Sequence, residues 1–208
     1  MTRLLNKYSS ILTQNLKSGP ARAMLYSLGL KTEDFNKPQV GIGAVYYESN
    51  PCNSKLNLLS SIVKTSIKDE NLLPWKFNSV GVSDGITMGT EGMRYSLPSR
   101  DLIADSFETI TDAHNYDSLV SIPGCDKNLP AVAMAMFRLN RPSMIIYGGS
   151  MQPSIYNGKE LDIVSSFEAY GNYIKNEINL EEYNNIIKNS CHNSCGSCSG
   201  LYTANTMA

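Results

Sequence analysis

The sequence predicts an α/β fold in which a mostly parallel sheet is flanked by helices on both faces. Short apolar runs of strand length recur along the chain, and a loop marked by glycine or proline follows each run. A helical pattern follows most of these loops, and strands that alternate with helices form parallel sheets. A chain of 208 residues is long enough to bury the core of one such domain, residues 1–208.

The first half of the chain contains two of the predicted strands. "QVGIGAVYY", residues 39–47, is the first strand, and the apolar spacing beyond it predicts a helix over about 56–68. "FNSVGV", residues 77–82, is the second strand. A helix over about 98–114 follows, with Pro98 in its first turn, where the missing N–H group breaks no hydrogen bond.

Two further strands and a helix follow in the same order. "SLVSI", residues 118–122, is the third strand, and "PSMIIYG", residues 142–148, is the fourth. The apolar segment "AVAMAMFRL", residues 131–139, predicts the helix between them. Its methionines are expected to lie in the core rather than on a binding surface.

Composition excludes several classes of function. Hydrophobic content of 42% and charged content of 18% are ordinary for a globular protein, and a net charge of −1 gives no electrostatic basis for binding nucleic acid or an anionic membrane. No apolar run approaches the roughly 18 residues of a membrane span. The five cysteines lie among Asp, Lys, Gly and Asn, which favours reduced, metal-binding thiolates over disulfides.

Polar side chains with metal-binding chemistry follow three of the predicted strands. Cys52 follows the first strand, Asp84 the second, and the triplet Cys125-Asp126-Lys127 the third. Ligands of open α/β sheets bind beyond the carboxyl ends of the strands. We therefore expect these three loops to meet at one edge of the sheet.

The triplet combines two kinds of metal ligand. The Cys125 thiolate suits iron or zinc, whereas the Asp126 carboxylate suits magnesium or manganese, and neighbouring side chains diverge, which favours two adjacent metal centres. Lys127 is either the ion-pair partner of Asp126 or, if buried, an amine able to form a carbamate with carbon dioxide. The competing interpretations are a solvated turn for the triplet, an Asp-Gly turn at Asp84 and a passive small residue at Cys52.

A second group of cysteines lies near the end of the chain. Cys191, Cys195 and Cys198 have the spacing C-x3-C-x2-C, with His192 inside the run. This spacing fits a local iron–sulfur triad, as in radical S-adenosylmethionine enzymes, a Cys/His zinc knuckle, or one ligand with two bystanders. The radical enzymes carry the motif early in the chain, and the surroundings here lack the basic or aromatic residues of a binding knuckle.

Four long segments together resemble the dihydroxy-acid/sugar-acid dehydratase family. They stand in the family's order: "NPCNSKL", "GVSDGITMGTEGMRYSLPSRDLIADSFE", "SIPGCDKNLPAVAMAMFRLNRPSMIIYGGSM" and "GSCSGLYTANTMA". Within the family, "MRYSLPSRD" and "YTANTMA" are more similar to the branched-chain biosynthetic enzyme than to its sugar-acid relatives. The resemblance implies the N-terminal α/β domain of a protein that continues into a C-terminal β-barrel domain.

The resemblance also implies a reaction, its cofactors and its ligands. The reaction is the dehydration of 2,3-dihydroxy acids such as 2,3-dihydroxy-isovalerate to 2-keto acids in valine, isoleucine and leucine biosynthesis. Gluconate- or xylonate-type substrates and a degenerate, non-catalytic fragment are the alternatives. The cofactors are an iron–sulfur cluster, [2Fe–2S] or in some members [4Fe–4S], and Mg²⁺. By motif, the cluster ligands are Cys52, Cys125 and Cys198, and the Mg²⁺ ligands are Asp84, Asp126 and carbamylated Lys127.

The remaining expectations concern the extent and context of the chain. The chain covers little more than a third of the family's length, so the 208 residues alone are expected to be nearly inactive. The full-length form is expected to be a homodimer that binds a small dihydroxy acid, in the cytoplasm or, in a eukaryote, in mitochondria or plastids. "SCHNSCGSCSG" departs from the family's "SCPGAGACGG", with Cys195 as the added cysteine, so Cys198 is expected to be the ligand and Cys191 and Cys195 bystanders.

Overall fold

A four-stranded, all-parallel sheet forms the centre of the molecule. The computed structural model describes residues 5–192 and residue 196. The strands are β1 (Gln39–Ala44), β2 (Leu73–Asn78), β3 (Ser118–Ile122) and β4 (Ser143–Ile145), in the order β2-β1-β3-β4. In the register of the sheet, Ile42 lies opposite Lys76 on one side and Val120 on the other. The predicted fold class is confirmed.

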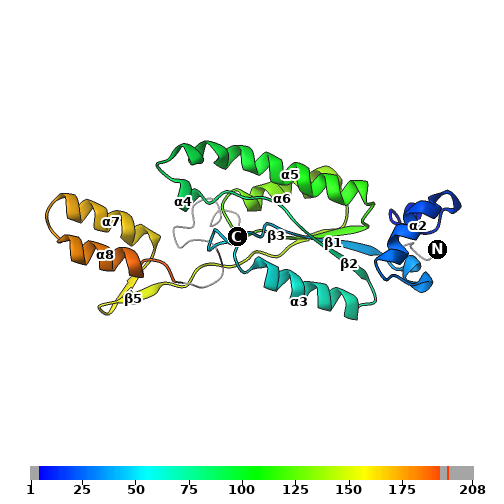
Figure 1. Ribbon diagram of the computed structural model, residues 1–208, viewed down its shortest axis with the longest axis horizontal. Coiled ribbons are helices and arrows are strands. Elements are labelled where there is room, and N and C mark those ends of the chain that lie inside the picture. Colours follow the sequence, from blue (N-terminus) through cyan, green and yellow to red (C-terminus); the bar gives the residue numbers. More distant parts are fainter. Residues whose placement is uncertain (1–4, 193–195, 197–208) are drawn as a thin grey trace.

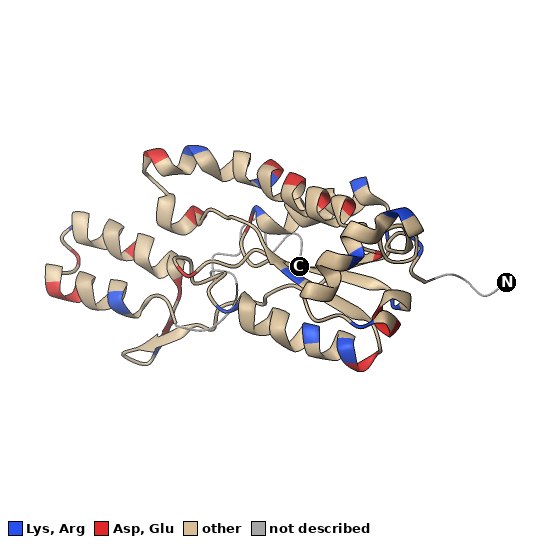
Figure 2. Ribbon diagram, turned by 45° about the vertical axis from the view of Figure 1, so that its right-hand side comes forward, with Lys and Arg blue, Asp and Glu red and all other residues tan. Residues whose placement is uncertain are grey.

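Helices cover both faces of this sheet (Figure 1). Helix α3 (Leu56–Asp69) packs on one face, and α5 (Ser96–Ala113) and α6 (Asn128–Leu139) pack together on the other. Acidic residues recur along the outer surface of α5 (Figure 2), which leaves the inward side of the helix for apolar residues. None of the helices in the described part of the chain is long and apolar enough to cross a membrane.

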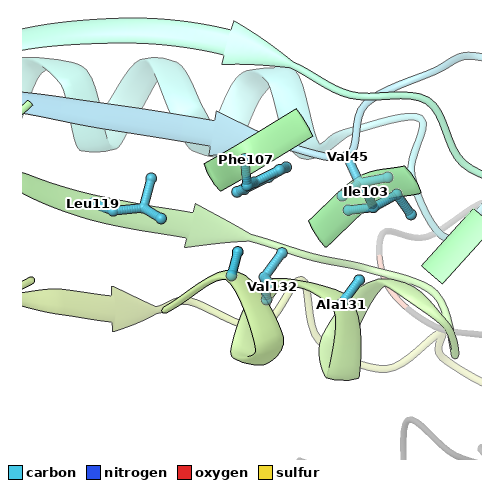
Figure 3. Packing of buried hydrophobic residues seen from close by; sticks show 7 residues of the cluster. Val45, Ile103, Phe107, Leu119, Ala131 and Val132 are labelled. Carbon is cyan, nitrogen blue, oxygen red and sulfur yellow. The ribbon is translucent and has the colours of Figure 1, made fainter. Parts of the chain in front are cut away.

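The larger core lies between the sheet and the α5–α6 pair (Figure 3). Val45 and Leu119 come from the sheet side, and they meet Ile103 and Phe107 of α5 and Val132 of α6. All five are fully buried. A smaller cluster on the opposite face joins residues of β1 and β3 to α3, because successive strand residues point to opposite faces. Its fully buried members are Ile42, Ala44, Leu56 and Ile122.

The strand order places a topological switch point in the middle of the sheet. From β1 the chain crosses outward to β2, and from β3 it crosses outward on the other side to β4. The crossovers therefore diverge between β1 and β3, and a crevice opens there at the carboxyl ends of the strands. The loop after β1 and the loop after β3 flank this crevice.

Smaller elements lie at the two ends of the molecule (Figure 1). Helices α1 (Ser10–Thr13) and α2 (Gly19–Ser27), with 3₁₀ turns η1 (Leu16–Ser18) and η2 (Thr32–Asn36), lie at the amino ends of the strands. Beyond the carboxyl ends lie the hairpin β5 (Ser154–Tyr156) and β6 (Lys159–Leu161) and the helix pair α7 (Ile163–Ile174) and α8 (Leu180–Asn189). Two short elements, α4 (Asp84–Thr87) and η3 (Glu91–Tyr95), precede α5.

The predicted position of the second strand, 77–82, is wrong by four residues at each end. The strand is Leu73–Asn78, and it contains Pro74. Proline is tolerated there because β2 is an edge strand, paired with β1 alone. The first and fourth strands are shorter than predicted, since β1 ends at Ala44 and β4 at Ile145. Helices α5 and α6 begin two and three residues earlier than predicted, at Ser96 and Asn128.

Candidate metal centre

Three loops from the carboxyl ends of the strands line one pocket of about 100 Å³. Cys52 comes from the loop after β1, Asp84 from the segment after β2, and Cys125 and Asp126 from the loop after β3. The structure thus brings together side chains that are up to 74 positions apart in the sequence, at the switch point of the sheet. Sulfur and oxygen donors face the same space.

The sulfur side of the pocket consists of two buried thiols, of Cys52 and Cys125, each 4% exposed. The hydrogen bond between them lowers the pKa of the Cys125 thiol below its usual value, although burial acts in the opposite direction. The Asn50 side chain and the backbone N–H of Asp126 also hydrogen-bond to Cys125 and lower its pKa. These contacts favour the thiolate, which is the form that binds metals.

The oxygen side is built around Asp84, the first residue of α4. Its carboxylate accepts a hydrogen bond of 2.5 Å from Ser96 Oγ through Oδ1 and one of 2.6 Å from Lys127 Nζ through Oδ2. Lys127 therefore pairs with Asp84, and not with its sequence neighbour Asp126, as one sequence-based interpretation had it. The ion pair is largely buried, with side-chain exposures of 16% for Lys127 and 9% for Asp84.

Several residues around the pocket carry no motif that sequence reasoning could recognise. Ser96 is one of them, and the buried asparagines Asn50, Asn53 and Asn128 are the others. The available signal was their position, since two of these asparagines flank "PC" at residues 51–52 and the third follows the Cys-Asp-Lys triplet directly. Tyr47 accepts a hydrogen bond from Asn50, and burial raises the pKa of its phenol, which therefore stays neutral.

The remaining cysteines differ in where they lie, and the ion pair between Arg94 and Glu91 lies on the surface. Cys195 and Cys198 lie outside the described residues, whereas Cys191 is exposed and also lines the pocket. Arg94 and Glu91, both 80% exposed, form an ion pair of 2.9 Å on the surface. Within residues 5–192 and at residue 196, no group of three or more His, Cys, Asp or Glu side chains is arranged to hold a metal ion by itself.

Proteins similar to this chain carry dehydratase names. Residues 37–208 match the N-terminal domain family of the dihydroxy-acid/6-phosphogluconate dehydratases. The chain belongs to this dehydratase family. A dihydroxy-acid dehydratase of Francisella tularensis subsp. novicida is 53% identical over 208 residues, which are 100% of this chain and 37% of the relative. A mitochondrial dihydroxy-acid dehydratase of Aspergillus terreus is 55% identical over 205 residues, 98% of this chain and 34% of the relative.

Membership of the dehydratase family covers the whole pocket. The matched range of 37–208 includes every pocket-lining residue named above, from both sides of the switch point. A further relative, a dihydroxy-acid dehydratase of Cytophaga hutchinsonii, is 52% identical over 204 residues, 98% of this chain and 36% of the relative. The chain thus spans little more than a third of the length of these dehydratases.

Proposed function

We propose that this chain forms the cluster- and magnesium-binding part of a hydro-lyase that dehydrates 2,3-dihydroxy carboxylic acids. One observation carries the proposal: in a chain of the dehydratase family, buried thiols and buried carboxylates face a single pocket at the switch point of the sheet. Soft sulfur ligands suit an iron–sulfur cluster, and hard oxygen ligands suit Mg²⁺. The donor set therefore fits both cofactors.

The sulfur side provides ligands for the cluster. We assign Cys52, Cys125 and Cys198 as its three protein ligands, and a [2Fe–2S] cluster as its form. Support comes from the contact between the first two thiols and from the hydrogen bonds that favour a thiolate at Cys125. Three protein ligands leave one iron position open for a substrate oxygen.

The oxygen side provides ligands for Mg²⁺. We assign Asp84, Asp126 and a carbamate of Lys127 to this ion. The amine of Lys127 must lose its proton before it reacts with carbon dioxide, and that loss also removes the ion pair with Asp84. Three anionic groups would then share one buried space, which is costly unless a divalent cation neutralises them.

The reaction removes the C2 proton and the C3 hydroxyl group of the substrate as water, and the resulting enol tautomerises to a 2-keto acid. When bound, the two metal centres supply Lewis acidity, the hard one toward a carboxylate and the softer one toward a hydroxyl group. The chain's own residues orient the ligands. Ser96 holds one oxygen of Asp84, and the buried loops keep bulk water away from the thiols.

We propose 2,3-dihydroxy-isovalerate as the substrate and branched-chain amino-acid biosynthesis as the pathway. The names of the relatives and the segments "MRYSLPSRD" and "YTANTMA" support this choice over gluconate or xylonate. The test is a 2-keto acid assay with the longest form of the protein that can be isolated. We expect turnover of the dihydroxy-isovalerate to exceed that of gluconate by about tenfold or more. Faster turnover of gluconate would favour the sugar-acid class instead.

The cysteine assignment is tested by replacing the cysteines near residue 198 one at a time. After anaerobic reconstitution with ferrous iron and sulfide, Cys198→Ser is expected to lose bound iron, while Cys195→Ser keeps it. Cys191→Ser is also expected to keep its iron. This variant is the more stringent control, because Cys191 lines the pocket. Loss of iron with Cys195→Ser or Cys191→Ser, but not with Cys198→Ser, would reverse the assignment.

A further inference from the structure

A chain of side-chain amides links the two cysteine loops. Asn50 and Asn53 belong to the loop after β1, and Asn128 is the first residue of α6, directly behind the Cys-Asp-Lys triplet. Asn50 is 1% exposed, and Asn53 and Asn128 are fully buried. Buried amides are costly unless they are hydrogen-bonded, so their partners indicate what they hold in place.

The hydrogen bonds run without a break from one cysteine backbone to the other. The N–H of Cys52 donates to Asn50 Oδ1 at 3.4 Å, and Asn50 Nδ2 donates to Asn53 Oδ1 at 2.6 Å. Asn53 Nδ2 then donates to Asn128 Oδ1 at 2.9 Å. The N–H of Cys125 donates to the same Asn128 oxygen, also at 2.9 Å. Three side chains therefore connect the backbones of Cys52 and Cys125.

The chemistry of the partners fixes the orientation of the Asn53 and Asn128 amides. Turning Asn128 over would bring its NH₂ group against the N–H of Cys125, so that two donors would face each other. Turning Asn53 over would bring its oxygen against Asn128 Oδ1 and against the carbonyl oxygen of Val45, to which Asn53 Nδ2 also donates. The link therefore has one direction, and the Val45 carbonyl anchors it to the end of β1.

We propose that Asn50, Asn53 and Asn128 are positioning residues that set the separation and orientation of the Cys52 and Cys125 sulfur atoms. Their role in cluster binding rests on the proposed function, whereas their role in holding the two thiols together does not. Asn53 and Asn128 act through the backbones of the two cysteines, and Asn50 in addition hydrogen-bonds to the Cys125 side chain. Gly124 allows the close approach, because a Cβ atom there would clash with the carbonyl oxygen of Cys52.

Two Asn→Asp substitutions, which change the size and charge of the side chain by the same amount, test the link. One is expected to keep the hydrogen bonds and the other to break them. Asn128→Asp keeps an oxygen acceptor for Cys125 N–H and Asn53 Nδ2, so the link survives. Asn53→Asp removes both donors of Asn53 and places carboxylate oxygens against the Val45 and Asn128 oxygens, so the link breaks. Asn50→Ala gives a second break at the Cys52 end, should Asn53→Asp fail to fold. Gln39→Leu removes a buried amide contact with Trp75 at the far end of β1 and is the control.

The first measurement needs no cluster. In a background with Cys191→Ser, Cys195→Ser and Cys198→Ser, phenylarsine oxide captures the remaining pair only if both thiols reach one arsenic atom. We expect capture by the background protein, Asn128→Asp and Gln39→Leu, and about tenfold weaker capture by Asn53→Asp and Asn50→Ala. Equal capture by folded Asn53→Asp or Asn50→Ala would overturn the inference.

The second measurement uses the chain with all five cysteines, reconstituted with ferrous iron and sulfide. Asn53→Asp and Asn50→Ala are expected to change the electron paramagnetic resonance spectrum of the reduced cluster and to release iron to a chelator about tenfold faster. Asn128→Asp is expected to keep the slow release. If the unmodified chain takes up no iron and sulfide while capture of the arsenical still depends on Asn53, the proposed function fails and the inference about the thiol pair stands.

Discussion

At the scale of single residues, the partners of Asp84 show how the proposed cation site would be organised. Both of its oxygens have partners, Ser96 on one side and Lys127 on the other, at 2.5 and 2.6 Å. A carboxylate that is held in this way loses little conformational freedom when it binds a metal. Ser96 is therefore a positioning residue for the proposed Mg²⁺ ligand.

Replacing Ser96 with alanine is expected to weaken the cation site and to leave the fold intact. Asp84 would then lose the partner of its Oδ1 oxygen, so Mn²⁺ used as a probe for Mg²⁺ should bind about tenfold more weakly. Titration followed by electron paramagnetic resonance measures this affinity. Ser106→Ala, on the same helix but bonded to Ser79 and Ile103, is the control. Equal Mn²⁺ affinity in both variants would contradict the role of Ser96.

The sequence was sufficient to predict that the candidate metal ligands lie close together, but not which side chains they contact. Cys52, Asp84 and Cys125 each follow an apolar run, and the rule for parallel sheets predicts that such loops meet. The pairing of Lys127 with Asp84, 43 positions away, was not predictable, because it depends on where the two loops settle in space. The amide link was missed for the same reason, since asparagine beside a cysteine is an ordinary loop residue.

At the scale of elements, the packing of α5 on β1 depends on a residue without a side chain. The rings of Phe107 and Phe77 meet edge to face with centroids 5.1 Å apart, directly over Gly43. A Cβ atom at Gly43 would lie 2.6 Å from Phe77 Cζ and 2.8 Å from Phe107 Cζ. Glycine in the middle of β1 thus allows the two rings to lie close to the strand.

Gly43→Ala is therefore expected to destabilise the protein by about 1–3 kcal/mol through overpacking. Gly171→Ala is the matched control, because Gly171 lies within α7 and has open space around its Cβ position. Alanine should stabilise that helix by about 0.5–1 kcal/mol. Chemical denaturation measures both changes in the free energy of unfolding. Changes of the same sign would contradict the packing account of Gly43.

Elements in the centre of the sheet were easier to predict than those at its edges. The prediction for β3 matches its bounds, because its apolar residues Leu119, Val120 and Ile122 form one short run that ends before Pro123 and Gly124. The edge strand β2 begins at Leu73 and includes Pro74, a residue that argues against a strand unless the edge position is known. The β5–β6 hairpin has no comparable apolar signal, since its residues are exposed or half-buried.

At the scale of the whole molecule, Asp117 ties the N-terminal helices to the sheet. Its carboxylate accepts hydrogen bonds from the backbone N–H groups of Tyr8 at 2.7 Å, Ser9 at 3.1 Å and Gln39 at 2.8 Å. The guanidinium of Arg141 stacks on the ring of Tyr8, 4.1 Å from its centroid. These contacts lie at the amino ends of the strands, opposite the pocket.

Asp117→Asn is expected to loosen this attachment without affecting the pocket. One side-chain oxygen would become an NH₂ group facing a backbone N–H, which lowers the free energy of unfolding by about 1–3 kcal/mol. Each kcal/mol lowers Tm by about 2–4 °C in a chain of this size. Thermal unfolding measures the shift, and hydrogen exchange should show faster exchange at Tyr8 and Ser9. Asp69→Asn, at the exposed end of α3, is the control. An unchanged Tm with Asp117→Asn would contradict the proposed anchor.

The central claim is that the switch point of the sheet holds an iron–sulfur cluster between loops distant in sequence. The most direct measurement is the amount of iron and acid-labile sulfide per chain after anaerobic reconstitution, in the unmodified protein and in Cys125→Ser. We expect about two iron and two sulfide per unmodified chain, and a loss of both in the variant. Zinc without sulfide, or equal iron in both proteins, would contradict the account.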